Sequence, residues 1–150
     1  MKKKSIIITL ILVLIMLIGY VSWEYYNSHK VKEDIKLKNN IVKVVHNSEE
    51  VDFSKVANFK WDTLYLFTPY TDTQKILKND SVKNYNNELN MEYNDTINII
   101  AFVDSKKIVK YIAINRSDFD FESIDNNKTS KNKSIFKIIN DNENCILSLK

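Results

Sequence analysis

The chain has 150 residues, 22 of them basic and 19 acidic, which gives a formal net charge of +3. That excess comes from Lys2, Lys3 and Lys4, because from Glu24 onward 19 basic residues balance the 19 acidic ones. A balanced surface lacks the electrostatic attraction on which binding to nucleic acid or to anionic lipid depends, so we exclude both as partners of this part. The single cysteine, Cys145, excludes an intrachain disulfide.

The first predicted element is an uncharged, apolar helix at residues 5–23. At 1.5 Å per residue it spans roughly 28 Å, close to the hydrocarbon thickness of a bilayer. Because Lys2, Lys3 and Lys4 precede it, residues 1–4 are expected to form a cytoplasmic flank and the rest of the chain to be exported. A cleaved signal peptide and the reversed topology are the alternatives. The apolar run exceeds the usual length of a signal peptide core, and no small-x-small cleavage triplet follows it, which favours a retained single-pass signal-anchor.

Residues 24–50 are predicted to form a juxtamembrane stalk and a helix. The stalk is charged and aromatic, and residues 35–45 then place apolar side chains at the spacing of one helical face. Three residues share that face: Leu37, Ile41 and Val44. The remaining part, residues 51–150, is predicted to be one extracytoplasmic domain.

Within this domain, residues 61–67 have the aromatic and branched composition of a strand. Pro69 ends the strand, because proline cannot donate a ladder hydrogen bond. Thr71 and Gln74 then match the spacing of a capping box, so a helix is predicted over residues 72–79.

Two hairpins complete the predicted elements. Residues 97–103 and 108–114 form the first, and residues 134–139 and 145–149 form the second. Residues 82–93 repeat apolar side chains at helical spacing among many Asn and Glu, which indicates a weak helix or an ordered loop. The fold class is therefore α+β: an N-terminal transmembrane helix, then a small antiparallel sheet of about five strands with two or three helices.

The residues that usually carry chemistry are few. Gly19, the only glycine, lies in the apolar helix, so the domain has neither a phosphate-cradling loop nor a nucleophile elbow. The two histidines, His29 and His46, and one cysteine do not make a standard zinc site. Three alternating acids lack the loop of a calcium site: Asp118, Asp120 and Glu122. We therefore assign no catalytic, cofactor-binding or metal-binding residues, and expect no cofactor.

The most specific local pattern surrounds the predicted strand at residues 61–67. Trp61 and Asp62 open it, and Pro69 and Tyr70 follow it. In one interpretation these residues belong to the core and to a turn, with Asp62 bonded to nearby backbone amides. In the other, Trp61, Asp62, Pro69 and Tyr70 form a protein-binding patch that presents amphipathic rings to a partner.

This segment resembles a group of small, uncharacterised exported or membrane-anchored proteins of Gram-positive bacteria, which share a WD…PY(T/S) sequence before a helix and a hairpin. The matching residues are Phe59, Trp61, Asp62, Phe67, Pro69, Tyr70 and Thr71. The hairpin AFVDSKKIVKY is similar to the strand pair of the same group, so the resemblance covers residues 50–114. It implies anchoring in the envelope but no mechanism, and this chain departs from lipid-attached members because it lacks an N-terminal cysteine.

The sequence leaves three functions open. The leading hypothesis is a non-enzymatic binding or accessory module, held at the cell membrane and acting on a cell-envelope protein. The second is an immunity or inhibitor protein against a secreted toxin or envelope enzyme. The third is an enzyme that uses a pair of carboxylates on an envelope polymer.

Overall fold

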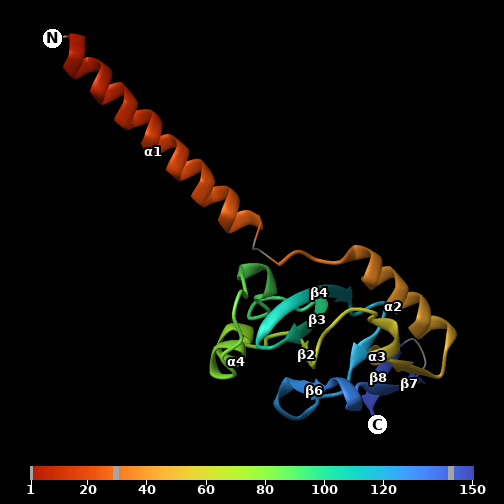
Figure 1. The fold of residues 1–150 in the computed structure, drawn as a ribbon. Coiled ribbons are helices and arrows are strands. Elements are labelled where there is room, and N and C mark those ends of the chain that lie inside the picture. The colour runs from red at the N-terminus through yellow and green to blue at the C-terminus, as the bar shows by residue number, and fades with distance from the viewer. Residues whose placement is uncertain (1, 29–30, 142–143) are drawn as a thin grey trace. The chain divides into compact units, whose positions relative to one another are not determined.

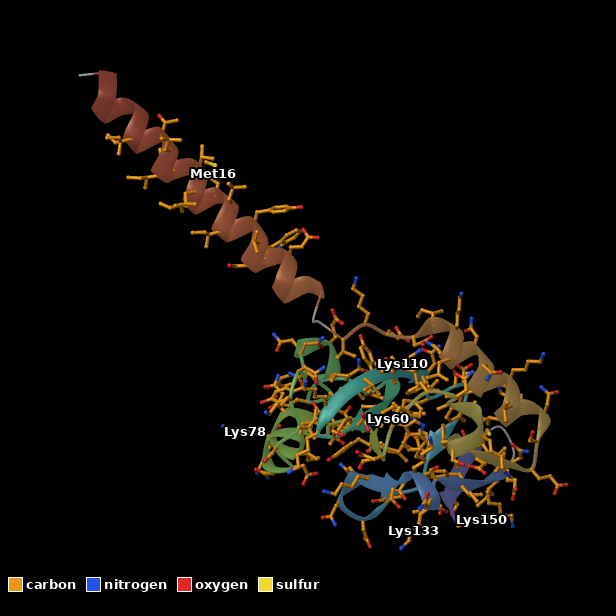
Figure 2. All side chains as sticks on the ribbon, in the orientation of Figure 1. Met16, Lys60, Lys78, Lys110, Lys133 and Lys150 are labelled. Atoms are coloured by element: carbon orange, nitrogen blue, oxygen red, sulfur yellow. The ribbon has the colours of Figure 1, made fainter. Side chains whose placement is uncertain are left out.

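The structure, a computed structural model, describes residues 2–28, 31–141 and 144–150. The chain divides into two compact units: the N-terminal helix α1 (Lys2–Ser28) belongs to the first, and Val31–Lys150 form the second. In α1 the stretch Ile7–Glu24 is long and apolar enough to span a membrane, and none of it is buried in the protein. Its large apolar side chains are exposed, and Met16 points away from the helix axis (Figure 2). The predicted apolar helix is thus confirmed.

The second unit is an α+β fold, as predicted, but its sheet arrangement differs from the prediction. The described residues form eight strands in two four-stranded sheets (Figure 1). The first sheet has the order β4-β3-β2-β6 and comprises β2 (Thr63–Phe67), β3 (Ile97–Asp104), β4 (Lys107–Asn115) and β6 (Lys128–Ser130). The second has the order β1-β7-β8-β5 and comprises β1 (Glu50–Asp52), β5 (Asp120–Phe121), β7 (Ile135–Asp141) and β8 (Asn144–Leu149).

The prediction of one antiparallel sheet of about five strands is therefore wrong. Strands β1, β5 and β6 have only two or three residues, which is too short for an alternating pattern to be recognised. The pair β5–β8 is moreover parallel, whereas every other pair is antiparallel within the described residues. Both predicted hairpins are confirmed, as β3–β4 and β7–β8.

The helices of this unit are short. They are α2 (Ile35–Asn47), α3 (Phe53–Val56) and α4 (Thr73–Asn79), with 3₁₀ turns at Asn87–Leu89, Asp125–Asn127 and Lys131–Lys133. Helix α2 buries Leu37, Ile41 and Val45 against the core, so it is an integral part of the unit that begins at Val31. Helix α4 starts as predicted, but Asp72 caps it by accepting a bond from Lys75 N at 3.0 Å. Thr71 instead donates to Thr68 O, so the predicted capping box is wrong.

Strand β3 separates two hydrophobic cores. Its residues from Asn98 to Val103 are all buried, with side chains alternating between the two faces of the first sheet. Ile100 and Phe102 point into the core between the two sheets, and Ile99 and Ala101 into the core on the opposite face. A cross-strand neighbour lies on each side, since β3 pairs with both β2 and β4.

The core between the sheets is built largely of aromatic rings. Phe53 of α3 meets Phe136 of β7 edge to face at 5.4 Å between centroids, and Phe136 also contacts Phe121 of β5. Such edge-to-face contacts add to the stabilisation that ring burial provides. Helices α2 and α3 lie at one end of the sheets and α4 at the other (Figure 1).

The outer core covers the other face of the first sheet. Leu77 of α4, Leu89 and Met91 close over Phe67 of β2 and Ile99 of β3. The segment between α4 and β3 contains no α-helix, only a short 3₁₀ turn, and is thus the ordered loop of the two predicted alternatives. The loop also holds Tyr70, because Met91 O accepts a hydrogen bond from Tyr70 N.

The segment Val31–Asp34 covers the exposed edge of β4. Asp34 N donates to Tyr111 O at 2.9 Å, and the Glu33 carboxylate accepts a bond from Ala113 N at 3.1 Å. Asp34 also accepts from Leu37 N at 2.9 Å as the cap of α2, and pairs with Lys110. These bonds satisfy an edge that would otherwise offer free backbone groups to other chains.

The far end of the same edge is covered by Asn84. Its side-chain amide donates to Ile108 O and its carbonyl accepts from Ile108 N, both at 2.9 Å, as a neighbouring strand would. Because Asn84 has a φ of 57°, it also supplies the left-handed turn that glycine often provides. The Asn84 side chain and the segment Val31–Asp34 thus bond to the edge of β4, where a fifth strand of the sheet would otherwise lie.

Replacing the cap of α2 tests this arrangement. We expect Asp34→Ala to lower the free energy of unfolding by about 1 kcal/mol, as for other lost N-caps. The hydrogen bonds from Lys110 and Leu37 N lower the pKa of Asp34, so its contribution is present above about pH 4 and is lost as the pH falls through the folded-state pKa. Denaturant unfolding of the two proteins at neutral and at acid pH should therefore show a difference that shrinks in acid.

The matched control is Asp125→Ala. Asp125 is exposed, and its side chain forms no hydrogen bond within the described residues. A loss of stability for Asp125→Ala equal to that for Asp34→Ala would contradict the assignment.

Candidate functional site

The four residues of the predicted patch lie at two ends of one strand. Trp61 and Asp62 precede β2, and Pro69 and Tyr70 follow it. An extended chain advances about 3.3 Å per residue, which separates the two pairs by roughly 20 Å. The structure therefore brings each pair together but does not bring the pairs to one surface.

Trp61 lies in the core. Its exposed fraction is 3%, and its ring packs edge to face on Phe102 at 5.2 Å. The indole Nε1 donates to Ala57 O at 3.3 Å, which satisfies the one polar atom of the ring. Lys131 Nζ lies 5.1 Å from the ring centroid. The side chain thus has the surroundings of a structural residue.

Asp62 fixes the turn between β3 and β4. Its carboxylate accepts from Ser105 N at 2.8 Å and from Thr63 Oγ1 at 2.7 Å. Ser105 and Lys106 have φ values of 50° and 62°, so this two-residue turn adopts left-handed conformations without glycine. The structure thus agrees with the first of the two interpretations of the sequence, in which Asp62 bonds to a backbone amide.

Tyr70 is strained and exposed. Its φ is 62°, a left-handed conformation that is costly for a bulky residue, and its exposed fraction is 68%. A bond from Tyr70 N to Met91 O at 2.9 Å holds this conformation. Pro69 beside it is half-buried. The geometry directs the ring of Tyr70 into solvent.

A second exposed ring lies on the loop to which the backbone of Tyr70 is bonded. Tyr93 has an exposed fraction of 86%, and it follows Met91, the buried residue to which Tyr70 is bonded. The turn continues with a bond from Asn94 N to Met91 O at 3.3 Å. We call Tyr70 and Tyr93 the tyrosine surface. Tyr93 is not among the predicted site residues, because the backbone contact that joins its loop to Tyr70 follows no spacing along the chain.

A polar groove lies beside β2 and β6. Its centre is Asp80, whose carboxylate accepts from Tyr65 Oη at 2.8 Å and from Lys128 Nζ at 2.6 Å. The Lys128 ammonium also lies 5.9 Å from the centroid of the Tyr65 ring. On one side of this pair is a hollow of about 490 Å³ that extends to Asp62 and Lys106. We call this feature, together with the hollow on its other side, the Asp80 groove.

The groups at the centre of the Asp80 groove have fixed protonation states. The hydrogen bonds from Lys128 and Tyr65 lower the pKa of Asp80 below its ordinary value. Burial, and after it the hydrogen bond to Asp80, raises the pKa of Tyr65 far above its ordinary value. At neutral pH Asp80 is therefore ionised and Tyr65 protonated, which favours the hydrogen bond between them.

A second hollow, of about 240 Å³, continues the groove on the other side of Asp80 and Lys128. Three asparagines line it: Asn79, Asn126 and Asn127. None of their side-chain amides makes a hydrogen bond within the part of the chain that the structure describes. Asn126 and Asn127 have φ values of 55° and 54°, which turn the chain into β6.

The remaining candidates for chemistry lie apart. His46 is exposed at the end of α2, and His29 is outside the described residues. Burial raises the pKa of the Cys145 thiol, which disfavours the nucleophilic thiolate. Over residues 2–28, 31–141 and 144–150, no group of three His, Cys, Asp or Glu side chains is placed to hold a metal ion.

The three alternating acids also have separate partners or positions. Asp120 binds Arg116 at 2.8 Å and accepts from the Asn98 amide at 3.0 Å. Glu122 accepts a hydrogen bond from Ser148 Oγ, and Asp118 is half-buried in the turn before β5.

No family model matches the chain, and no curated protein and no solved structure shows significant similarity to it.

The burial of Trp61 gives a direct test of its role. We expect Trp61→Ala to cost about 3–5 kcal/mol of unfolding free energy, because it removes a large ring from a packed core. Chemical denaturation of the full-length protein in micelles measures this loss. Trp61→Phe, which keeps a ring on Phe102, serves as the control and should lose less. An alanine variant that unfolds like the parent would place Trp61 outside the core.

Proposed function

We propose that this chain is a single-pass membrane protein with a cytoplasmic N-terminus, and that its folded unit acts outside the cell membrane as a non-enzymatic binding or accessory module for a cell-envelope protein. The apolar stretch Ile7–Glu24 supports the membrane attachment. Lys2, Lys3 and Lys4 support the orientation, since basic residues favour the cytoplasmic side.

The tyrosine surface is the observation that carries the binding role. A bulky residue in a left-handed conformation costs about 1–3 kcal/mol, and such strain is concentrated at functional sites. Tyr70 bears this cost while its ring lies in solvent, where it contributes little to the core. Tyrosine is enriched at protein interfaces because it offers a large, rigid, amphipathic ring at a low cost in side-chain entropy.

The chemistry around the tyrosine surface supports a protein partner. Acidic side chains flank the rings: Asp72 caps α4 two residues after Tyr70, and Glu92 accepts a bond from Tyr93 Oη at 3.4 Å. A partner surface with lysine or arginine would meet both the carboxylates and the faces of the rings.

The Asp80 groove supports a binding role over a catalytic one. Its central tyrosine is held protonated and its central carboxylate ionised at neutral pH, so neither group is poised to exchange a proton with a substrate.

Topology can be tested with a cysteine that reports its side of the membrane. We expect Lys78→Cys, on exposed α4, to react with a membrane-impermeant maleimide in intact cells when Cys145 is replaced by serine. Lys3→Cys in the same background is the control and should react only after permeabilisation. The opposite pattern of labelling would overturn the orientation.

The binding role can be tested by photo-crosslinking. We expect a photoreactive phenylalanine analogue at position 93, and at position 70, to capture one discrete envelope protein in cells. The same analogue at position 78, which is exposed on α4, is the matched control and should not capture it. Identical adducts from all three positions, or none from positions 70 and 93, would argue against the tyrosine surface as the binding site.

A further inference from the structure

The Asp80 groove is a second surface, distinct from the tyrosine surface. Helix α4 separates them, because Tyr70 precedes its first residue and Asn79 is its last. The helix has seven residues, which corresponds to about 10 Å of rise. The two surfaces thus share no residue, and the groove is considered by itself.

The centre of the groove is preorganised. Asp80 is held between Tyr65 and Lys128, and at the far end Asp62 is held by Ser105 N and Thr63 Oγ1. Each carboxylate oxygen has further lone pairs, so both groups can still accept bonds from a ligand hydroxyl without moving. Side chains whose positions are already fixed lose little conformational freedom on binding.

The other end of the groove carries free hydrogen-bonding capacity. The amides of Asn79, Asn126 and Asn127 line the 240 Å³ hollow and have no partner among the described residues. An amide presents a donor and an acceptor in one plane, and can bond two neighbouring hydroxyls or an acetamido group at once. Three such groups beside an ordered carboxylate form a surface for a ligand rich in hydroxyls.

The charges of the groove select against an anionic ligand. Two acids, Asp62 and Asp80, and two bases, Lys106 and Lys128, line its larger hollow. Lys128 is already paired with Asp80, which leaves Lys106 as the one base of this hollow without an ion pair among the described residues, while both carboxylates repel a phosphate or sulfate chain. The 490 Å³ of this hollow lie within the roughly 300–1,000 Å³ typical of small-molecule sites.

We propose that the Asp80 groove binds a neutral oligosaccharide, with the amides of Asn79, Asn126 and Asn127 and the carboxylate of Asp80 bonded to its hydroxyl or acetamido groups. A sugar chain suits a groove that continues past Asp80 into a second hollow, since successive rings can occupy the two hollows. The proposal is independent of the protein partner of the tyrosine surface.

The test uses the full-length protein in a detergent that has no sugar headgroup. The probes are chitotetraose and cellotetraose, and hydrogen–deuterium exchange followed by mass spectrometry reports where they bind. We expect at least one probe, at millimolar concentration, to slow exchange around residues 62–65, 79–80 and 126–128. No slowing with either sugar, or slowing confined to other segments, would overturn the proposal.

The variants are chosen to keep the fold. Asn79 is an exposed residue at the end of α4, so Asn79→Ala removes an amide without disturbing the core, and Asn126→Gly keeps the left-handed φ. We expect the double variant to bind the sugar about tenfold more weakly, the effect of losing two or more neutral hydrogen bonds. Asn39→Ala, an exposed asparagine of α2, is the matched control and should bind like the parent.

Two further outcomes bear on the proposal. If the double variant binds the sugar like the parent, the asparagines do not form the site. Should the double variant fold poorly, the single variant Asn79→Ala is used in its place, and unchanged sugar binding by that variant has the same meaning. Stronger binding of a polyphosphate than of either neutral sugar, at matched ionic strength, would refute the neutral class of ligand. A thermal melt of each variant, unchanged from the parent, shows that any loss of binding is local.

Discussion

Strand β3 is the constraint on which the folded unit depends, because its two faces serve two different cores. Phe102 and Ile100 bring the second sheet and α2 onto one face, whereas Ile99 and Ala101 receive α4 and the loop that follows it on the other. A strand buried on both faces cannot shift its register by one residue without exchanging the two cores. Both candidate surfaces include or adjoin residues of the outer core, such as Tyr65 and Met91, so their geometry depends on the packing against this one strand.

Several elements could be predicted from the sequence because their own residues carry a local signal: apolar spacing, strand composition, or the turn residues beside them. The hairpins β3–β4 and β7–β8 and the helices α2 and α4 are of this kind. Strands β1, β5 and β6 exist only because longer strands provide a neighbour, as when Val51 pairs with Phe136 and Phe121 with Leu147. Their two or three residues contain no pattern of their own, and they extend two sheets whose longer strands, β2–β3–β4 and β7–β8, are already separate.

The candidate site was predictable to a smaller extent, for a related reason. Neighbours in sequence were taken as neighbours in space, but the extended β2 carries Trp61 into the core and Tyr70 to the opposite end of the strand. The second exposed ring, Tyr93, lies in a loop whose position depends on the packing of Leu89 and Met91 in the outer core. The φ of Tyr70 is likewise set by its bond to Met91 O, a contact between distant segments that no local pattern encodes.

The edge of β4 and the start of α2 are stabilised by the same few residues. Glu33 and Asp34 satisfy backbone groups of β4, and Asp34 also caps α2, which packs on the core between the sheets. An uncovered edge of this length would be free to pair with another chain. Because this segment comes directly before α2 in the chain, a protein cut after Asp34 would lose α1 together with the cover of its sheet. Val31–Asp34 are thus structural residues of the folded unit.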